Sequence, residues 1–216
     1  DPTFTSAYEV DYLKRFKKIT INTAIFYRQS DGNVERIQQE TGELVDLIVD
    51  TRTNNSVLQV PVLEYYPINL ATNKRFGSEL SIAYTPSRSV RINGSFTLNS
   101  TKIRGNYLGQ SFDSDDTNWS ARFNGFIRLP KDYSLQFFGF LRGPSENAFS
   151  KSKAFGFTTA AIQKSIFNKK GNISLRYSDL FNTGKWRSIT TREAFRSESE
   201  GQWREPSLIL TFSYRI

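Results

Sequence analysis

Apolar and polar residues alternate with a period of two along much of the chain, which is the pattern of β-strands with one apolar and one polar face. The clearest case is the segment 90–99, VRINGSFTLN. One of its faces carries Val90, Ile92, Gly94, Phe96 and Leu98, and the other carries Arg91, Asn93, Ser95, Thr97 and Asn99. The pattern predicts an all-β, antiparallel, up-and-down architecture.

The same alternation recurs, and we expect about nine strands, or ten if residues 58–70 hold another. Two segments are less regular. Phe138 and Phe140 interrupt the polar face of one, and the faces of 155–164 cannot be assigned. The predicted strands are residues 8–16, 19–27, 77–84, 90–99, 119–129, 133–142, 155–164, 173–178 and 208–216.

Short and long connections alternate strictly along this series. The short ones are 16–18, 85–88, 129–132 and 167–172, and the long ones are 30–76, 101–118, 143–153 and a hairpin tip within 182–205. Outer-membrane barrels sort their connections in this way, with short periplasmic turns and long extracellular loops. The sequence therefore predicts a transmembrane β-barrel in the bacterial outer membrane, with the C-terminal Ile216 on the periplasmic side.

An odd number of strands is unusual, since bacterial single-chain barrels have an even count. An open sheet in lipid would leave unpaired backbone groups along both edges. We therefore expect residues 1–216 to be one domain, the C-terminal part of a larger barrel.

Composition narrows the function. Aromatic residues make up 14% of the chain, with 18 Phe and 10 Tyr, although the mean hydropathy is −0.49. Cysteine and histidine are absent, which removes thiolate and imidazole chemistry. We expect no enzyme activity and no cofactor.

The net charge of +8 is dispersed along strands and turns, so we expect no nucleic-acid partner. No apolar run is long enough for a transmembrane helix, and Asp1 opens directly in polar sequence.

Several side chains are candidates for chemistry. Five arginines on polar faces could line the path of an anionic substrate, although solvation or pairing with carboxylates of a plug is favoured: Arg91, Arg122, Arg128, Arg142 and Arg176. The acidic run Asp113, Asp115 and Asp116 offers oxygen ligands for calcium. It lacks the glycine and distal glutamate of a known calcium loop, so a solvated loop and no metal site are favoured.

Aromatic residues near strand ends fit an interfacial girdle better than a soluble sandwich core: Tyr8, Tyr27, Tyr84, Trp119, Tyr133 and Tyr177. Other aromatics lie where ligand stacking is conceivable and loop packing is the default: Tyr65, Tyr66, Tyr107, Trp186 and Trp203. Glutamates 193, 198, 200 and 205 are read as loop charge, not as a glycosidase-like pair. The basic turns at Lys17/Lys18, Lys131 and Lys169/Lys170 fit anionic headgroups or gatekeeping at strand ends equally well.

Three stretches resemble the barrel domain of TonB-dependent receptors of Bacteroidota. They are the opening DPTFTSAYEVDYLKRF, the run RFGSELSIAYTPSRSVRINGSFTLNSTKIRGNYLGQSFD, and LRYSDLFNTGKWRSITT followed by the ending LILTFSYRI. The resemblance covers nearly the whole chain. One departure is the terminal Ile216, where an aromatic residue is commoner, although Phe212 and Tyr214 keep the aromatic alternation upstream.

The resemblance implies a 22-stranded barrel closed by a plug domain, which imports a bulky nutrient through a gated lumen with energy delivered by TonB. Neither the plug nor a TonB box lies within these residues. The partners it implies are outer-membrane lipid, the rest of the barrel, the plug with TonB acting through it, and a surface lipoprotein. The alternative is a structural or scaffold barrel within a larger envelope assembly.

Overall fold

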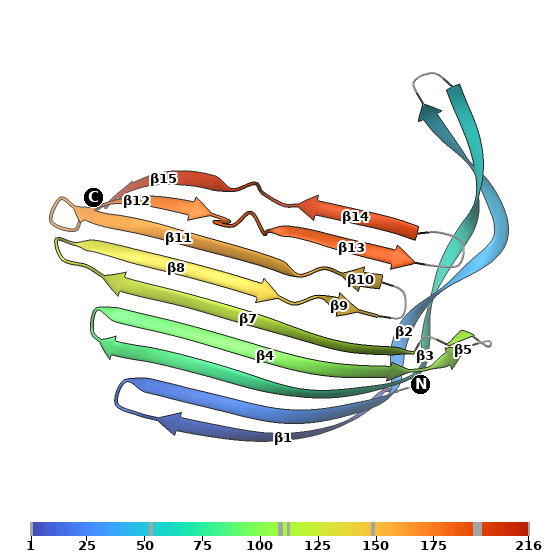
Figure 1. Ribbon diagram of the computed structural model, residues 1–216, viewed down its shortest axis with the longest axis horizontal. Helices are drawn as coiled ribbons and strands as arrows, with labels where there is room; N and C mark the ends of the chain where they lie inside the picture. The colour runs from blue at the N-terminus through green and yellow to red at the C-terminus, as the bar shows by residue number, and fades with distance from the viewer. Residues whose placement is uncertain are drawn as a thin grey trace.

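The computed structural model describes residues 2–51, 54–107, 110–111, 113–147, 150–191 and 196–215. Nine strands form one antiparallel sheet in the order β1-β2-β3-β4-β7-β8-β11-β12-β15 (Figure 1). β1 and β15 are the edges of this sheet, so it is open. The strands are β1 (Phe4–Arg15), β2 (Ile19–Thr51), β3 (Asn54–Ser87), β4 (Val90–Arg104), β7 (Ser114–Arg128), β8 (Tyr133–Arg142), β11 (Phe155–Ile166), β12 (Gly171–Ser178) and β15 (Ser207–Tyr214).

The predicted all-β, up-and-down antiparallel architecture is confirmed. Each of the nine predicted segments coincides with one strand of the main sheet, and their order along the chain is also their order across the sheet. The four short turns lie at one end of the sheet, which we call the turn end, together with the end of β15 (Figure 1). The long connections lie at the opposite end, the loop end.

The prediction of a loop at residues 30–76 is wrong. β2 and β3 continue past the main sheet as a long two-stranded hairpin, which we call the arm (residues 33–51 and 54–71), visible at the right of Figure 1. Gly32 (φ 70°) and Gly42 (φ 81°) each lie where the pairing of the two strands shifts register. A glycine with positive φ is typical of a β-bulge, which bends a strand without ending it.

The other long connections also contain strands. β5 (Asn106–Tyr107) pairs with β6 (Gln110–Ser111) between β4 and β7. A four-stranded sheet joins β9 (Ser145–Glu146), β10 (Ser150–Ser152), β13 (Lys185–Thr191) and β14 (Arg196–Gln202) in the order β14-β13-β10-β9. Two connections that are far apart in the sequence therefore pair with each other at the loop end, which alternation within one segment could not reveal.

Strand register separates two faces of the main sheet. Pairing partners lie on the same face, so Arg91, Phe126 and Gln136 share the polar face, while Ile92, Gly125 and Phe137 share the apolar face. Register also resolves residues 155–164, because Phe138 pairs with Thr159 and Gln136 with Ala161. Thr159 and Ala161 therefore belong to the polar face.

The apolar face is covered by large side chains that remain exposed, such as Phe96, Leu98, Ile173, Leu210 and Phe212. Few side chains in the described residues are buried, Ala24 and Phe26 on the polar face among them. This is the reverse of a water-soluble sandwich, whose apolar faces pack against each other. None of the described residues forms a helix long and apolar enough to cross a membrane.

Two phenylalanines of the apolar face lie over glycines of the neighbouring strand. Phe123 on β7 pairs with Gly139 on β8, and Gly125 pairs with Phe137. The two ring centroids are 6.3 Å apart. A Cβ added to either glycine would overlap the ring that covers it. The glycines are therefore required by the packing of the rings, an arrangement that also fixes the register of the two strands.

Candidate functional site

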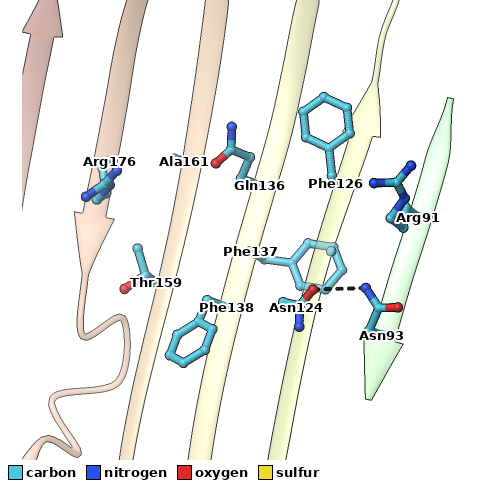
Figure 2. Close-up of a pocket in the computed structure, with 11 residues that line it drawn as sticks. Arg91, Asn93, Asn124, Phe126, Gln136, Phe137, Phe138, Thr159, Ala161 and Arg176 are labelled. Atoms are coloured by element: carbon cyan, nitrogen blue, oxygen red, sulfur yellow. Dashed lines mark hydrogen bonds between the residues drawn. The ribbon is translucent and has the colours of Figure 1, made fainter. Parts of the chain in front are cut away.

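The polar face is hollowed at its centre, where two register rows cross five strands. One row runs Arg91, Phe126, Gln136, Ala161, Arg176 from β4 to β12. The adjacent row runs Asn93, Asn124, Phe138, Thr159. Side chains of these two rows line a cavity of about 520 Å³ (Figure 2). Its volume lies within the range of small-molecule sites, about 300–1,000 Å³.

Charge in this central cavity sits at its two sides. Figure 2 shows Arg91 on β4 and Arg176 on β12, with the aromatic and amide side chains between them. Asn93 Nδ2 donates a hydrogen bond to Asn124 Oδ1 at 3.1 Å, which fixes both amides on the floor. Ala161 is small and leaves room beside Arg176. The cavity therefore offers two guanidinium groups, two fixed amides and two phenyl rings.

A second cavity of about 370 Å³ lies nearer the turn end and shares Arg91 with the first. Its lining includes Arg88 from the β3–β4 turn and Arg128 from the end of β7. The backbone N–H of Arg128 donates to the carbonyl oxygen of Ser89 at 2.7 Å, which ties the turn to β7. Three arginines thus line this second cavity, and no carboxylate is among its lining residues.

The two remaining candidate arginines lie closer to the loop end on the same face. The Arg122 guanidinium carbon is 5.6 Å from the centroid of the Phe140 ring, a cation–π geometry. Arg142 pairs with Phe155, whose ring centroid is 6.4 Å from that of Phe140. Register therefore places all five predicted arginines on the polar face, and the central cavity brings Arg91 and Arg176 together.

None of the five arginines takes part in an ion pair within the described part of the chain. The ion pairs found there join other residues: Arg28 with Glu9, Arg104 with Asp113 and Asp115, Lys151 with Glu146, Lys169 with Asp132, Arg187 with Glu200, and Arg196 with Glu198. Solvation or pairing with carboxylates of a plug, which sequence analysis favoured for these arginines, stays a prediction. The five positively charged side chains lie exposed on the polar face of the sheet.

Sequence analysis missed the aromatic part of this site. Phe126 and Phe138 line the central cavity, yet neither was a candidate, because alternation assigns phenylalanines to the apolar face. The signal was present: Phe138 and Phe140 break the alternation of their strand, and Phe126 breaks that of β7. An aromatic residue out of phase in an amphipathic strand is a sign of a ring on the polar face. Asn93, Asn124, Gln136 and Thr159 carried no comparable signal.

The acidic run at the loop end is engaged with protein groups. Asp115 forms an ion pair and hydrogen bond with Arg104, and Asp113 Oδ1 accepts the Gly105 backbone N–H at 3.0 Å. Asp116 Oδ1 accepts the Glu146 N–H at 2.9 Å. The hydrogen bond from Arg104 lowers the pKa of Asp115, and the same contact raises the pKa of Arg104. Within the described residues, no group of three or more acidic side chains is arranged to hold a metal ion.

This contact predicts a pH-dependent opening of the loop between β4 and β7. Because the pKa of Asp115 is lowered in the folded state, its contribution is complete above the ordinary aspartate pKa of about 4 and is lost as the pH falls through the lowered value. We expect the protection of the Gly105 amide, which is the intrinsic exchange rate divided by the observed one, to fall below about pH 4. Arg104→Gln should remove this pH dependence. A wild-type exchange profile that follows the intrinsic rate throughout would contradict the prediction.

The aromatic residues considered for ligand stacking do not form one cluster. Tyr66 and Tyr107 pack against the fully buried Ala71 at the base of the arm, and the Tyr66 hydroxyl donates to Glu64 at 2.6 Å, which raises the pKa of Tyr66. Trp186 packs over Gly201, whereas Trp203 is 97% exposed. Glu198 and Glu200 each pair with an arginine, and Glu193 lies outside the described residues.

The six girdle candidates fall at two levels of the apolar face. Tyr84 and Tyr133 lie beside short turns, whereas Tyr8 pairs and stacks with Tyr27 farther from the turn end, at 6.5 Å between centroids. Trp119 stacks with Phe96 at 6.2 Å, and Tyr177 is the penultimate residue of β12. Their expected position near strand ends is wrong for Tyr27, since β2 runs on to Thr51. The apolar alternation stops after Tyr27, but the strand does not.

The basic turns gather at the turn end beside aromatic rings. Lys17/Lys18, Lys131 and Lys169/Lys170 lie in three of the short turns. Lys164 Nζ is 4.1 Å from the centroid of the Tyr133 ring and also donates to the Lys131 carbonyl oxygen at 2.7 Å. The choice between headgroup contact and gatekeeping stays a prediction.

Comparison with known proteins gives one assignment. The model of a family described as the outer membrane protein beta-barrel family matches residues 1–214, which is nearly the whole chain. No curated protein and no solved structure matches the chain.

Proposed function

Because the chain belongs to the outer membrane protein β-barrel family, we propose that it forms part of the barrel of a TonB-dependent receptor. In this proposal the barrel imports a bulky nutrient through a gated lumen, and the polar face of the sheet lines that lumen. The observation that carries the proposal is the hollowed polar face, lined by amides and phenyl rings, with five arginines that form no ion pair among the described residues. Such a surface fits the binding and passage of a solute.

The open edges of the sheet support a larger barrel. β1 and β15 each pair with a single neighbour, and in lipid an unpaired strand edge leaves backbone groups without partners. We propose that further strands flank both edges, as in the 22-stranded barrels that the sequence resembles, and that a plug domain fills the lumen. The proposed partners are therefore these strands, the plug, TonB acting through the plug, and outer-membrane lipid.

The arm favours one further candidate function, a scaffold within an envelope assembly. Residues 33–66 contain six acidic and two basic residues, in a chain of net charge +8. Among the described residues, the pairing of β2 with β1 ends at Asp31 and that of β3 with β4 begins at Thr72, so no strand pairs with the outer edges of the arm. An edge of this kind can pair with a strand of another protein. Under this alternative the arm would hold a partner such as a surface lipoprotein, and the lumen would carry no solute.

Binding to TonB distinguishes the receptor proposal from the scaffold alternative. The full-length gene product, purified in detergent, is mixed with the periplasmic domain of TonB from the same organism, and binding is measured by titration calorimetry. We expect saturable binding that disappears when the segment preceding the barrel is removed. A gene product that begins just before Asp1 with a signal peptide and does not bind TonB would contradict the receptor and leave the scaffold.

Orientation is tested independently by labelling. We propose that the turn end is periplasmic and the arm extracellular. Residues 1–216 contain no cysteine, so Lys131→Cys in a short turn and Glu43→Cys in the arm each introduce one thiol into this part of the protein. On intact cells, a membrane-impermeant maleimide should label the Glu43→Cys variant alone, and after lysis it should label both. Labelling of the Lys131→Cys variant on intact cells would reverse the orientation.

A further inference from the structure

The five arginines of the polar face are distributed over its height, not gathered at one level. Successive polar-face rows lie two residues apart along a strand, which is about 7 Å. From the turn end, Arg128 lies in the first of these rows, Arg91 and Arg176 in the second, Arg122 in the fourth and Arg142 in the fifth. We call this series the arginine ladder.

Phenyl rings accompany the ladder. Phe126 lies in the row of Arg91, and Phe138 lies in the next row toward the loop end. Phe140 is the pairing partner of Arg122. Phe155 pairs with Arg142. A solvated charged face needs no rings, and a purely apolar path needs no arginines. Their pairing in successive rows fits a ligand that is both anionic and flat or apolar, since a guanidinium binds carboxylate, sulfate or phosphate while the ring packs against the ligand body.

The second and third rows give this ligand its best site. Arg91 and Arg176 stand four strands apart in one row, about 19 Å between backbone positions, with the 520 Å³ cavity between them. Both guanidinium groups are exposed and lack a carboxylate partner in the described part of the chain. Only a molecule with acidic groups on opposite sides contacts both at once.

We propose that the arginine ladder selects an organic polyanion with a flat or aromatic body, and that the cavity between Arg91 and Arg176 is its central binding site. The proposal rests on the import function and names the class of its cargo. Because guanidinium groups at both sides of the cavity attract the anion, binding weakens as salt screens the charges.

The test uses the intact gene product in phospholipid vesicles and the fluorescent probe 1,3,6,8-pyrenetetrasulfonate, which is flat and carries four negative charges. Binding is followed by fluorescence anisotropy. We expect saturable binding to the wild type that weakens with added salt, and no saturable binding of proflavine, a flat cation. Arg91→Gln combined with Arg176→Gln should weaken probe binding at least about tenfold, the effect of losing roughly one strong charged contact.

Matched variants control for net charge and for folding. Arg187→Gln combined with Arg196→Gln removes two arginines from the β13–β14 hairpin, where each pairs with a glutamate, and should leave probe affinity unchanged. Arg91→Lys combined with Arg176→Lys keeps both charges but loses the planar fork, and should fall between the wild type and the Gln variant. Heat-modifiable migration on a gel confirms that each variant is folded.

Several results would overturn the inference. One is equal affinity of the Gln variant and the wild type for the probe. Another is proflavine binding as tight as that of the probe. The third is a wild-type lumen that does not bind the probe because carboxylates of a polypeptide segment already occupy the ladder. TonB binding that persists alongside any of these results would leave the import function standing and remove only the cargo class. Loss of TonB binding with intact probe binding would do the opposite.

Discussion

Gly125→Val should destabilise the barrel by about 3 kcal/mol, because overpacking a site without free space typically costs 1–3 kcal/mol and occasionally more. The added side chain meets the ring of Phe137, which occupies the space above Gly125, and backbone holds the glycine in place from both neighbouring strands. The measurement is the free energy of unfolding of the intact protein in urea, from a state folded in lipid vesicles.

Gly94→Val is the matched control. Gly94 lies on the same apolar face, but a Cβ there would meet only the Arg122 carbonyl oxygen, at 3.9 Å. We expect a change within about 1 kcal/mol, since valine has the better strand propensity. Adding Phe137→Ala to Gly125→Val should recover part of the loss, because it removes the ring that clashes. If the two glycine variants prove equally stable, or the double variant is strictly additive, the ring is not the cause.

Asp179→Ala should lower the free energy of unfolding by about 2–4 kcal/mol, through lost hydrogen bonds and not through overpacking. The Asp179 side chain is 1% exposed and accepts the backbone N–H groups of Thr183 at 3.0 Å and Gly184 at 2.9 Å. These bonds close the turn through which the chain leaves β12 for the β13–β14 hairpin. The substitution removes two hydrogen bonds to a charged acceptor, each worth about 1.5–3 kcal/mol, and water replaces part of this because Thr183 is exposed and Gly184 half-buried. Amide exchange at Thr183 and Gly184 should rise together with the loss of stability.

Asp132→Ala separates this effect from backbone strain. Asp132 has a φ of 60°, close to the 54° of Asp179, so both substitutions place alanine in the left-handed region. The Asp132 carboxylate, however, is half exposed, and within the described residues it makes an ion pair with Lys169 at 3.8 Å. Such a surface pair contributes about 0–1 kcal/mol. We expect this variant to lose at most about 1 kcal/mol, and a loss equal to that of Asp179→Ala would assign the effect to φ alone.

The main sheet was predictable because its information is local. Residues 90–99 and 208–216 alternate cleanly, since one face of each strand meets an apolar surrounding and the other a polar one. The arm was not predictable by the same means. Beyond Tyr27, neither face of β2 meets a uniformly apolar or uniformly polar environment. Apolar and polar residues therefore stop alternating, while the backbone pairing with β3 continues. The pairing of β10 with β13 joins residues about 40 positions apart, and no local pattern encodes it.

For the candidate site, the face on which each arginine lies was predictable from the sequence, but the grouping of side chains into a cavity was not. Arginines on the polar face follow from strand phase alone, and register confirms their common face. Which of them share a cavity depends on how strands are offset against each other, and this is why Arg91 and Arg176 could not be paired from the sequence. Phe126 was hidden by the expectation that a phenylalanine in an amphipathic strand faces outward.

The register itself carries one geometric consequence. The row that starts at Arg15, the turn-end residue of β1, passes through Asn93 and Thr159 and reaches β15 at Ser207, its loop-end residue. The turn end of β15 is Tyr214, seven positions farther on. Over eight strand spacings of about 4.8 Å, an offset of roughly 23 Å inclines the strands by about 31° to the axis of the curved sheet.

That inclination sets the height of the apolar band. Phe76 and Tyr84 bound it on β3 and are eight residues apart, which is about 27 Å along the strand. Projected on the axis, this becomes about 23 Å, close to the roughly 25 Å apolar band of outer-membrane barrels. The offset of nearly one residue per strand thus adjusts strands of this length to the thickness of the membrane.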